Sequence, residues 1–234
     1  MYTDFLLSKL TKKEVEQFFT VNIKSHLESL KNPGIVFGTN LPKGDSSKKP
    51  LLVVFRHGQS QDNIKRIFSG WRDVSLTSIG HSQAEQLAPK LKDIKFDYHF
   101  TSDLKRSMDT LHIAMGGRKY TPIIDWRLRE RSYGSFAGKN KITVSTQNLM
   151  LGALLRRSWE YAAPAGESAV MVYYRVLPFL KILEYVLRKE KKSAVICCSS
   201  NSMRAIRTYY ENLTPDQAID IENPTGQDYC LYNL

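Results

Sequence analysis

The chain has 234 residues, of which 42% are hydrophobic and 24% are charged, a balance that is ordinary for a globular protein with its own core. No apolar run approaches the length needed to span a bilayer, so we expect no membrane association. The formal net charge of +11 favours an anionic partner, but no zinc finger, RNA-recognition motif or similar signature accompanies it, so we expect no nucleic-acid partner.

The cysteines and the N-terminal composition indicate the compartment. Cys197, Cys198 and Cys230 include no C-x-x-C pair, which argues against a disulfide framework or a zinc site. The first residues lack a basic stretch followed by an apolar core, and acidic residues interrupt the basic ones, so neither a secretory signal nor a transit peptide is indicated. We therefore expect a reducing, cytoplasmic location.

Residues 1–49 differ from the rest of the chain. Thr11-Lys12-Lys13-Glu14 is typical of a capping box, and apolar residues follow at helical spacing, which predicts one helix that ends near Asn32-Pro33-Gly34. A stretch rich in Gly, Pro, Ser and Lys, from Gly38 to Pro50, then indicates a linker. We expect the apolar stripe of the helix to pack on the remaining chain; binding to a partner or to a membrane surface is the alternative.

After Pro50 the predicted strands and helices alternate. The expected strands are Leu51–Phe55, Phe96–Phe100, Pro122–Trp126, Ala194–Cys198 and Tyr229–Tyr232. The expected helices are Ser78–Lys92, Asp103–Met115, Val144–Tyr161, Glu167–Glu190 and Ser202–Asn212. This alternation predicts that residues 50–234 form one α/β domain, a three-layer sandwich with a mostly parallel sheet and helices on both faces. Ligands bind such sheets at the carboxyl ends of the strands.

Arg56-His57-Gly58 directly follows the first predicted strand. A histidine that is held in one tautomer can attack phosphorus, and the planar fork of an arginine suits phosphate oxygens. A glycine lets the backbone approach a ligand closely. The tripeptide alone is a weak signal, because a single histidine after a strand is more often structural.

A longer pattern strengthens the signal. The stretch RHGQSQDNIKRIFSGWRDVSLTSIG, residues 56–80, resembles the cofactor-dependent phosphoglycerate mutases of the histidine phosphatase superfamily. The likeness covers residues 51–234 and continues in order through Thr101–Arg106, Trp126–Gly134, Arg156-Arg157-Ser158, Asn201–Ala205 and Asn223–Gly226. The resemblance implies the fold of these mutases and phosphoryl transfer between 3- and 2-phosphoglycerate, with 2,3-bisphosphoglycerate as the primer. It also implies a site without metal, and a homodimer or homotetramer.

The resemblance implies roles by position. His57 would be the phosphorylated nucleophile, and Arg56 and Arg106 would hold the transferring phosphoryl group. Glu130 would be the general acid and base, although the arginines on either side of it are more typical of a surface carboxylate. The residues that would line the pocket and hold the substrate are Asn63, Ser69, Gly70, Tyr133, Lys141, Arg156, Arg157, Ser199 and Asn201.

The last catalytic loop departs from the family pattern. Cys198 to Ala205 reads CSSNSMRA where the family has A-H-G-N-S-[LM]-R-A, so Ser199 replaces the second catalytic histidine and Ser200 replaces a glycine. Ser199 can donate one hydrogen bond but carries no positive charge, and loss of a preorganised transition-state donor typically lowers the rate by about 10²–10³-fold. The sequence therefore predicts weak or absent mutase activity with binding retained.

Three functions follow from these residues. The first is a phosphoglycerate mutase of weak activity that acts on a small phosphorylated metabolite. The second is a pseudoenzyme that binds a phosphorylated ligand or a protein partner, which Ser199, Ser200 and the N-terminal segment favour. The third is a phosphatase of other phosphoesters, favoured by the short segment between Ser158 and Gly166, because a longer loop closes the pocket in most family members.

Overall fold

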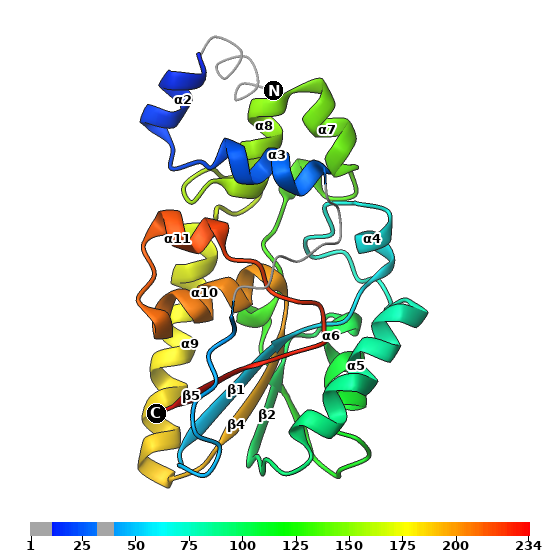
Figure 1. Cartoon of the computed structure of the whole chain (residues 1–234), viewed down its shortest axis with the longest axis vertical. Coiled ribbons are helices and arrows are strands. Elements are labelled where there is room, and N and C mark those ends of the chain that lie inside the picture. The colour runs from blue at the N-terminus through cyan, green and yellow to red at the C-terminus, as the bar shows by residue number, and fades with distance from the viewer. Residues whose placement is uncertain (1–10, 32–39) are drawn as a thin grey trace.

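Strand β1 (Leu51–Arg56) lies near the middle of a five-stranded sheet with the order β3-β2-β4-β1-β5 in the computed structural model, which describes residues 11–31 and 40–234 (Figure 1). The other strands are β2 (Tyr98–Thr101), β3 (Pro122–Ile124), β4 (Ala194–Cys198) and β5 (Cys230–Asn233). The first four strands run parallel, and β5 pairs antiparallel with β1. The predicted mostly parallel α/β sheet is confirmed.

Alternation along the two central strands builds two apolar layers. Leu52 and Val54 of β1 face a cluster made largely by α9 and α10, whereas Leu51, Val53 and Phe55 face a second cluster with α5 and α6. Figure 1 shows these helix pairs on opposite sides of the sheet. Full burial of each such side chain stabilises the fold by roughly 1.5–3 kcal/mol. The three-layer arrangement follows from this two-sided burial.

The helices differ from the predictions mainly at their ends. The long helices are α5 (Ser78–Leu91), α6 (Lys105–Ala114), α9 (Ala169–Glu190) and α10 (Ser200–Glu211), and α9 continues through Pro178. The others are α2 (Lys12–Phe18), α3 (Ile23–Lys31), α4 (Gln61–Ile64), α7 (Lys141–Gln147), α8 (Leu149–Arg157), α11 (Pro215–Asp220) and two short 3₁₀ helices, Trp126–Leu128 and Gly134–Phe136. The elements α4, α11 and the 3₁₀ helices were not predicted.

The prediction of one continuous helix from Val144 to Tyr161 was wrong, because the structure has two helices there, α7 and α8. Asn148 separates α7 from α8 because its backbone is extended, with φ −152° and ψ 100°. Its side-chain oxygen accepts a hydrogen bond from the Leu151 amide at 2.9 Å, so it caps the start of α8. The apolar spacing runs across this break, and the cap residue ends the first helix.

The predicted N-terminal helix is also two helices. Val21 forms an isolated bridge with Ser158, and the Asn22 side chain accepts from the Ser25 amide at 2.8 Å at the start of α3. The predicted end near residues 32–34 lies outside the described residues. The apolar stripe packs on the rest of the protein only in part: Val15 is fully buried in a cluster with Leu154, whereas Phe18 and Leu27 are exposed.

Residues 40–50 of the predicted linker pair with the sheet edge. The Leu231 amide donates to the Pro42 carbonyl at 2.8 Å, and the Gly44 amide donates to the Leu231 carbonyl at 3.0 Å. The Asn233 side-chain amide donates to the carbonyls of Asp45 and Lys48. These contacts cover the outer edge of β5, which would otherwise expose unpaired backbone groups. Among the described residues we find no helix that could serve as a membrane span.

Candidate active site

A cavity of about 760 Å³ lies beyond the carboxyl ends of β1 and β4, where residues 56–57 and 200–201 contribute to its wall. This volume is within the range typical of small-molecule sites. Eleven of the predicted site residues line it: Arg56, His57, Asn63, Ser69, Arg106, Glu130, Tyr133, Lys141, Arg156, Arg157 and Asn201. Segments far apart in the sequence thus meet at one end of the sheet.

Two predicted site residues do not line the cavity. Gly70 lies behind the wall with φ +54°, a conformation that favours glycine, and its carbonyl accepts from Nη2 of Arg106 at 2.9 Å. Ser199 precedes α10 and is fully buried, and its hydroxyl has no hydrogen-bond partner among the described residues. The structure therefore does not bring the Ser199 hydroxyl to the cavity wall.

The His57 ring is held in one tautomer. Its Nδ1 lies 2.7 Å from the Gly58 carbonyl oxygen, and a carbonyl only accepts, so Nδ1 carries the proton and Nε2 carries the lone pair. Nε2 accepts from Nε of Arg106 at 3.2 Å. Burial, together with the charges of Arg106 and Arg56, holds the pKa of His57 well below its ordinary value. The ring is therefore neutral, as a nitrogen nucleophile must be.

Two arginines beside His57 are fixed by backbone carbonyls. Arg106 is almost fully buried, and its Nη1 donates to the Arg72 carbonyl at 2.8 Å. Nη1 of Arg56 donates to the Asn223 carbonyl at 2.9 Å. These bonds preorganise positive charge around the nucleophile, which is what a phosphoryl group in transfer requires.

Gly58 serves close packing of the chain. A Cβ atom at Gly58 would lie 2.3 Å from the carbonyl oxygen of Gly80, a distance that no side chain tolerates. The sequence predicted that the backbone at Gly58 approaches a ligand, whereas the close approach that the structure shows is to the backbone of Gly80. It fixes the loop that carries His57 against the start of α5.

Glu130 is buried at the cavity, not exposed as its charged neighbours suggested. Its carboxylate accepts from the Arg131 amide at 2.7 Å, from Nδ2 of Asn201 at 2.7 Å and from the Ser200 amide at 3.1 Å. Burial raises the pKa of Glu130, but these bonds and the charges of Arg106 and Arg56 outweigh it and leave the pKa lowered. Glu130 is therefore ionised, ready to accept a proton.

The arginines that flank Glu130 are engaged elsewhere. Arg129 forms an ion pair with Asp103. Arg131 is almost fully buried, and its guanidinium donates to the carbonyls of Leu155, Tyr161 and Glu167. Because both guanidinium groups are bound, they do not make Glu130 a surface residue.

The paired arginines on α8 have different surroundings. Arg157 donates to the Ile219 carbonyl at 3.0 Å and forms an ion pair with Glu222, whose pKa is lowered to about 2 because Arg157 and Arg204 outweigh the effect of its burial. The Arg156 guanidinium has no hydrogen-bond or ion-pair partner in the part of the chain that the structure describes, and it lines the cavity. Arg156 is thus available to a substrate anion, whereas Arg157 is held internally.

Lys141 is the second available cation at this end of the cavity. Its ammonium group likewise makes no ion pair within residues 11–31 and 40–234, and it lies 5.7 Å from the ring centroid of Phe68. Burial and the charges of Arg156 and Arg56 lower the pKa of Lys141 to about 8. The Lys141 side chain therefore remains mostly charged at neutral pH and can attract a phosphate or carboxylate.

Several wall residues were missed by sequence reasoning. Arg204 belongs to the quoted NSMRA block and donates to Oδ1 of Asn201 at 3.1 Å, and Glu222 immediately precedes the NPTG block. Ser29 and Leu30 come from α3, so the N-terminal segment contributes to the wall. The motif blocks could have indicated the first two, but nothing in the sequence places α3 at the cavity.

The described residues contain no group of three or more His, Cys, Asp or Glu side chains that could hold a metal ion. The charged groups at the cavity are mostly arginine and lysine, which bind oxyanions directly. The arrangement can therefore bind a phosphate ester, present a neutral imidazole to its phosphorus and accept a proton at Glu130.

Comparison with known proteins identifies the family. The family model of the histidine phosphatase superfamily (branch 1) matches residues 52–231. The 2,3-bisphosphoglycerate-dependent phosphoglycerate mutase of Cytophaga hutchinsonii is 37% identical over 183 residues, which are 76% of this chain and 84% of that protein. The protein of the same name from Methanococcus vannielii is 33% identical over 215 residues, covering 78% of this chain and 90% of the relative.

Solved structures share the fold. Bacillus stearothermophilus YhfR has a TM-score of 0.69 at 24% identity, over 77% of this chain and 89% of that chain. A mycobacterial glucosyl-3-phosphoglycerate phosphatase in complex with VO3 has a TM-score of 0.70 at 22% identity, over 77% of this chain and 91% of that chain. The chain therefore belongs to the histidine phosphatase superfamily, among its phosphoglycerate mutase-like members.

Proposed function

We propose that this protein transfers phosphoryl groups through a phosphohistidine at His57 and interconverts 3- and 2-phosphoglycerate at a low rate. The observation that carries the proposal is the neutral His57 ring, whose Nε2 lone pair lies against Arg106. Nε2 bonds to phosphorus as the P–O bond of the donor ester breaks, and the leaving oxygen takes the proton that Glu130 gained in the preceding transfer. The phosphoryl group then passes to the hydroxyl of the acceptor, whose proton Glu130 takes, and the primer 2,3-bisphosphoglycerate is regenerated in each cycle.

The low rate follows from the last loop. If one cationic donor is lost, the remaining positive charges no longer neutralise the negative charge of the phosphorylated intermediate. Serine replaces histidine at position 199, and its buried hydroxyl does not line the cavity. The remaining cations, Arg56 and Arg106, support binding, so we expect substrate affinity to be retained better than turnover.

Hydrolysis of phosphomonoesters is the second candidate function, and the Arg157–Glu222 ion pair favours it. A mutase must retain a bisphosphorylated intermediate until it reorients, and Arg157 is not free to hold the second phosphate. Weaker retention gives water more time to attack the phosphohistidine. The mycobacterial phosphatase is only 22% identical to this chain, so its likeness supports the fold alone.

A paired assay tests the proposal. Formation of 2-phosphoglycerate from 3-phosphoglycerate, with and without 2,3-bisphosphoglycerate, is measured beside release of inorganic phosphate, in the unmodified protein and in His57→Ala. Primer-dependent isomerisation that His57→Ala abolishes supports the mutase, and primer-independent phosphate release that it abolishes supports the phosphatase. Tight binding of 3-phosphoglycerate with neither product would instead support a pseudoenzyme. The homodimer or homotetramer implied by the resemblance stays a prediction that light scattering can test.

A further inference from the structure

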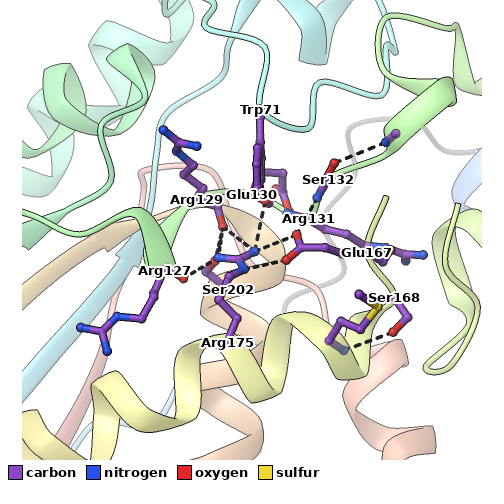
Figure 2. Close-up of polar contacts among 12 residues, drawn as sticks. Trp71, Arg127, Arg129, Glu130, Arg131, Ser132, Glu167, Ser168, Arg175 and Ser202 are labelled. Atoms are coloured by element: carbon purple, nitrogen blue, oxygen red, sulfur yellow. Dashed lines mark hydrogen bonds and ion pairs between the residues drawn. The ribbon is translucent and has the colours of Figure 1, made fainter. Parts of the chain in front are cut away.

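The backbone that carries Glu130 is held by a cluster of side chains around Arg175, a residue of α9 (Figure 2). Nη1 of Arg175 donates to the Arg127 carbonyl at 2.6 Å. Its Nη2 donates to the carbonyls of Arg129 at 3.4 Å and Glu130 at 3.3 Å. One guanidinium thus contacts three carbonyl groups within four residues, the last of them that of Glu130 itself.

Glu167 fixes the guanidinium in place. Nε and Nη2 of Arg175 donate to the two Glu167 carboxylate oxygens at 2.7 and 3.0 Å, which is a bidentate pair with a fixed plane. The side chains are only 6% and 13% exposed, so solvent screens the pair weakly. The same carboxylate accepts from the Ser132 amide at 2.8 Å. The ion pair therefore binds the chain on both sides of Glu130.

Two further donors complete the cluster, as Figure 2 shows. Nε1 of Trp71 donates to the Glu130 carbonyl at 2.7 Å, and the Ser202 hydroxyl donates to the Arg129 carbonyl. Ser202 lies in the first turn of α10, whose amides at positions 200 and 201 hold the Glu130 carboxylate. The helices α9 and α10 thus hold both the backbone around Glu130 and its carboxylate.

We propose that Arg175, locked by Glu167, is a positioning residue that aims the Glu130 carboxylate at the oxygen that gains or loses a proton during phosphoryl transfer. Arg175 does not line the cavity, so it acts through Glu130 and not on the substrate. This inference rests on the proposed phosphoryl transfer through His57. A proton donor misplaced by about 1 Å can lower a rate on the order of 10²-fold, which is the size of effect a loosened backbone would produce.

Leaving-group dependence separates positioning from a general structural role. The ionised Glu130 first takes the proton of the acceptor hydroxyl as that hydroxyl receives the phosphoryl group. When Nε2 of His57 then attacks the phosphorus of an alkyl ester, the P–O bond breaks and the leaving oxygen takes this proton back from Glu130. A 4-nitrophenolate leaves without that proton. We therefore expect Arg175→Gln to lower the rate with 3-phosphoglycerate on the order of 10–100-fold and to change the rate with 4-nitrophenyl phosphate by less than about 3-fold.

Matched variants sharpen the comparison. Arg188→Gln removes a guanidinium from the same helix, where its ion pair with Glu184 is exposed, and should change neither rate. Arg175→Lys keeps the charge but loses the bidentate fork, so its selective loss with 3-phosphoglycerate should be intermediate. An equal fall with both substrates, or no selective loss in Arg175→Gln, would overturn the proposal.

An activity-independent measurement keeps the inference separate from the proposed function. If the unmodified protein turns over neither ester, the proposed function fails. The contacts of Arg175 with the Glu130 backbone can still be tested by hydrogen exchange of the segment 127–132. We expect exchange there to be on the order of ten-fold faster in Arg175→Gln than in the unmodified protein or Arg188→Gln. Unchanged exchange in this segment would overturn the positioning role whatever the activity.

Discussion

Acidification should weaken the packing of α3 on α8 through His26. This side chain is fully buried, and neither ring nitrogen has a hydrogen-bond partner among the described residues. Burial and the charges of Arg156 and Arg157 lower its pKa to about 4 in the folded protein, against 6.5 in an unfolded chain. The folded state therefore binds the proton less well, so this contribution to stability is full above pH 6.5 and is lost as the pH falls towards 4.

The loss can be estimated by linkage. Between pH 7.5 and pH 5 the two pKa values give a decrease of about 2 kcal/mol in the free energy of unfolding. In urea unfolding this corresponds to a midpoint lower by roughly 1 M. His26→Leu should remove that part of the pH dependence, whereas His81→Gln, on the exposed face of α5, should leave it intact. The reasoning is refuted if His26→Leu and the unmodified protein lose the same stability between the two pH values.

Three further predictions concern the cavity. Glu222→Gln releases Arg157 and removes a carboxylate from the wall, so calorimetry should show affinity for 2,3-bisphosphoglycerate increased by about 10-fold, and an unchanged or weaker affinity would contradict this. Because the pKa of Lys141 is about 8, affinity for phosphoglycerate should fall as the pH rises from 7 to 9, and Lys141→Arg should abolish that fall; a fall that persists in the variant would point to another group. Leu30→Glu places a carboxylate in the wall contributed by α3 and should weaken phosphate-ester binding several-fold, whereas Leu27→Glu on the same helix, which does not line the cavity, should not; equal effects would mean that α3 acts only through its packing.

The sequence was sufficient for the sheet and for most of the cavity. The all-apolar runs that become β1 and β4 are buried at nearly every position, and strands of this kind need partners on both faces. Parallel strands place their following loops at one edge, which is why His57 and Asn201 meet although they lie far apart in the chain. Local pattern and topology were enough to predict the sheet and the edge at which the site lies, whereas the individual cavity residues were predicted from the resemblance to the mutases.

Other features depended on long-range partners that no local pattern contains. Glu130 looked exposed because its neighbours are charged, but those neighbours bind groups 24 to 36 residues away in the sequence. Arg157 looked available to substrate, but Glu222, 65 residues further on, holds it. Arg175 lies in a long amphipathic helix where a basic residue is usually solvated, and its partners are backbone carbonyls of a distant segment. Apolar spacing also ran across the break at Asn148, where a cap decided the boundary.

Transfer of phosphate to His57 is the central claim, and direct detection of the phosphoenzyme tests it. The protein is mixed with 2,3-bisphosphoglycerate, quenched within milliseconds to minutes, and analysed by mass spectrometry for an acid-labile phosphate on the peptide that contains His57. We predict the label on His57 at up to one equivalent, slow to accumulate, and its absence in His57→Ala. No label at any time, or a label that persists in His57→Ala, would contradict the account.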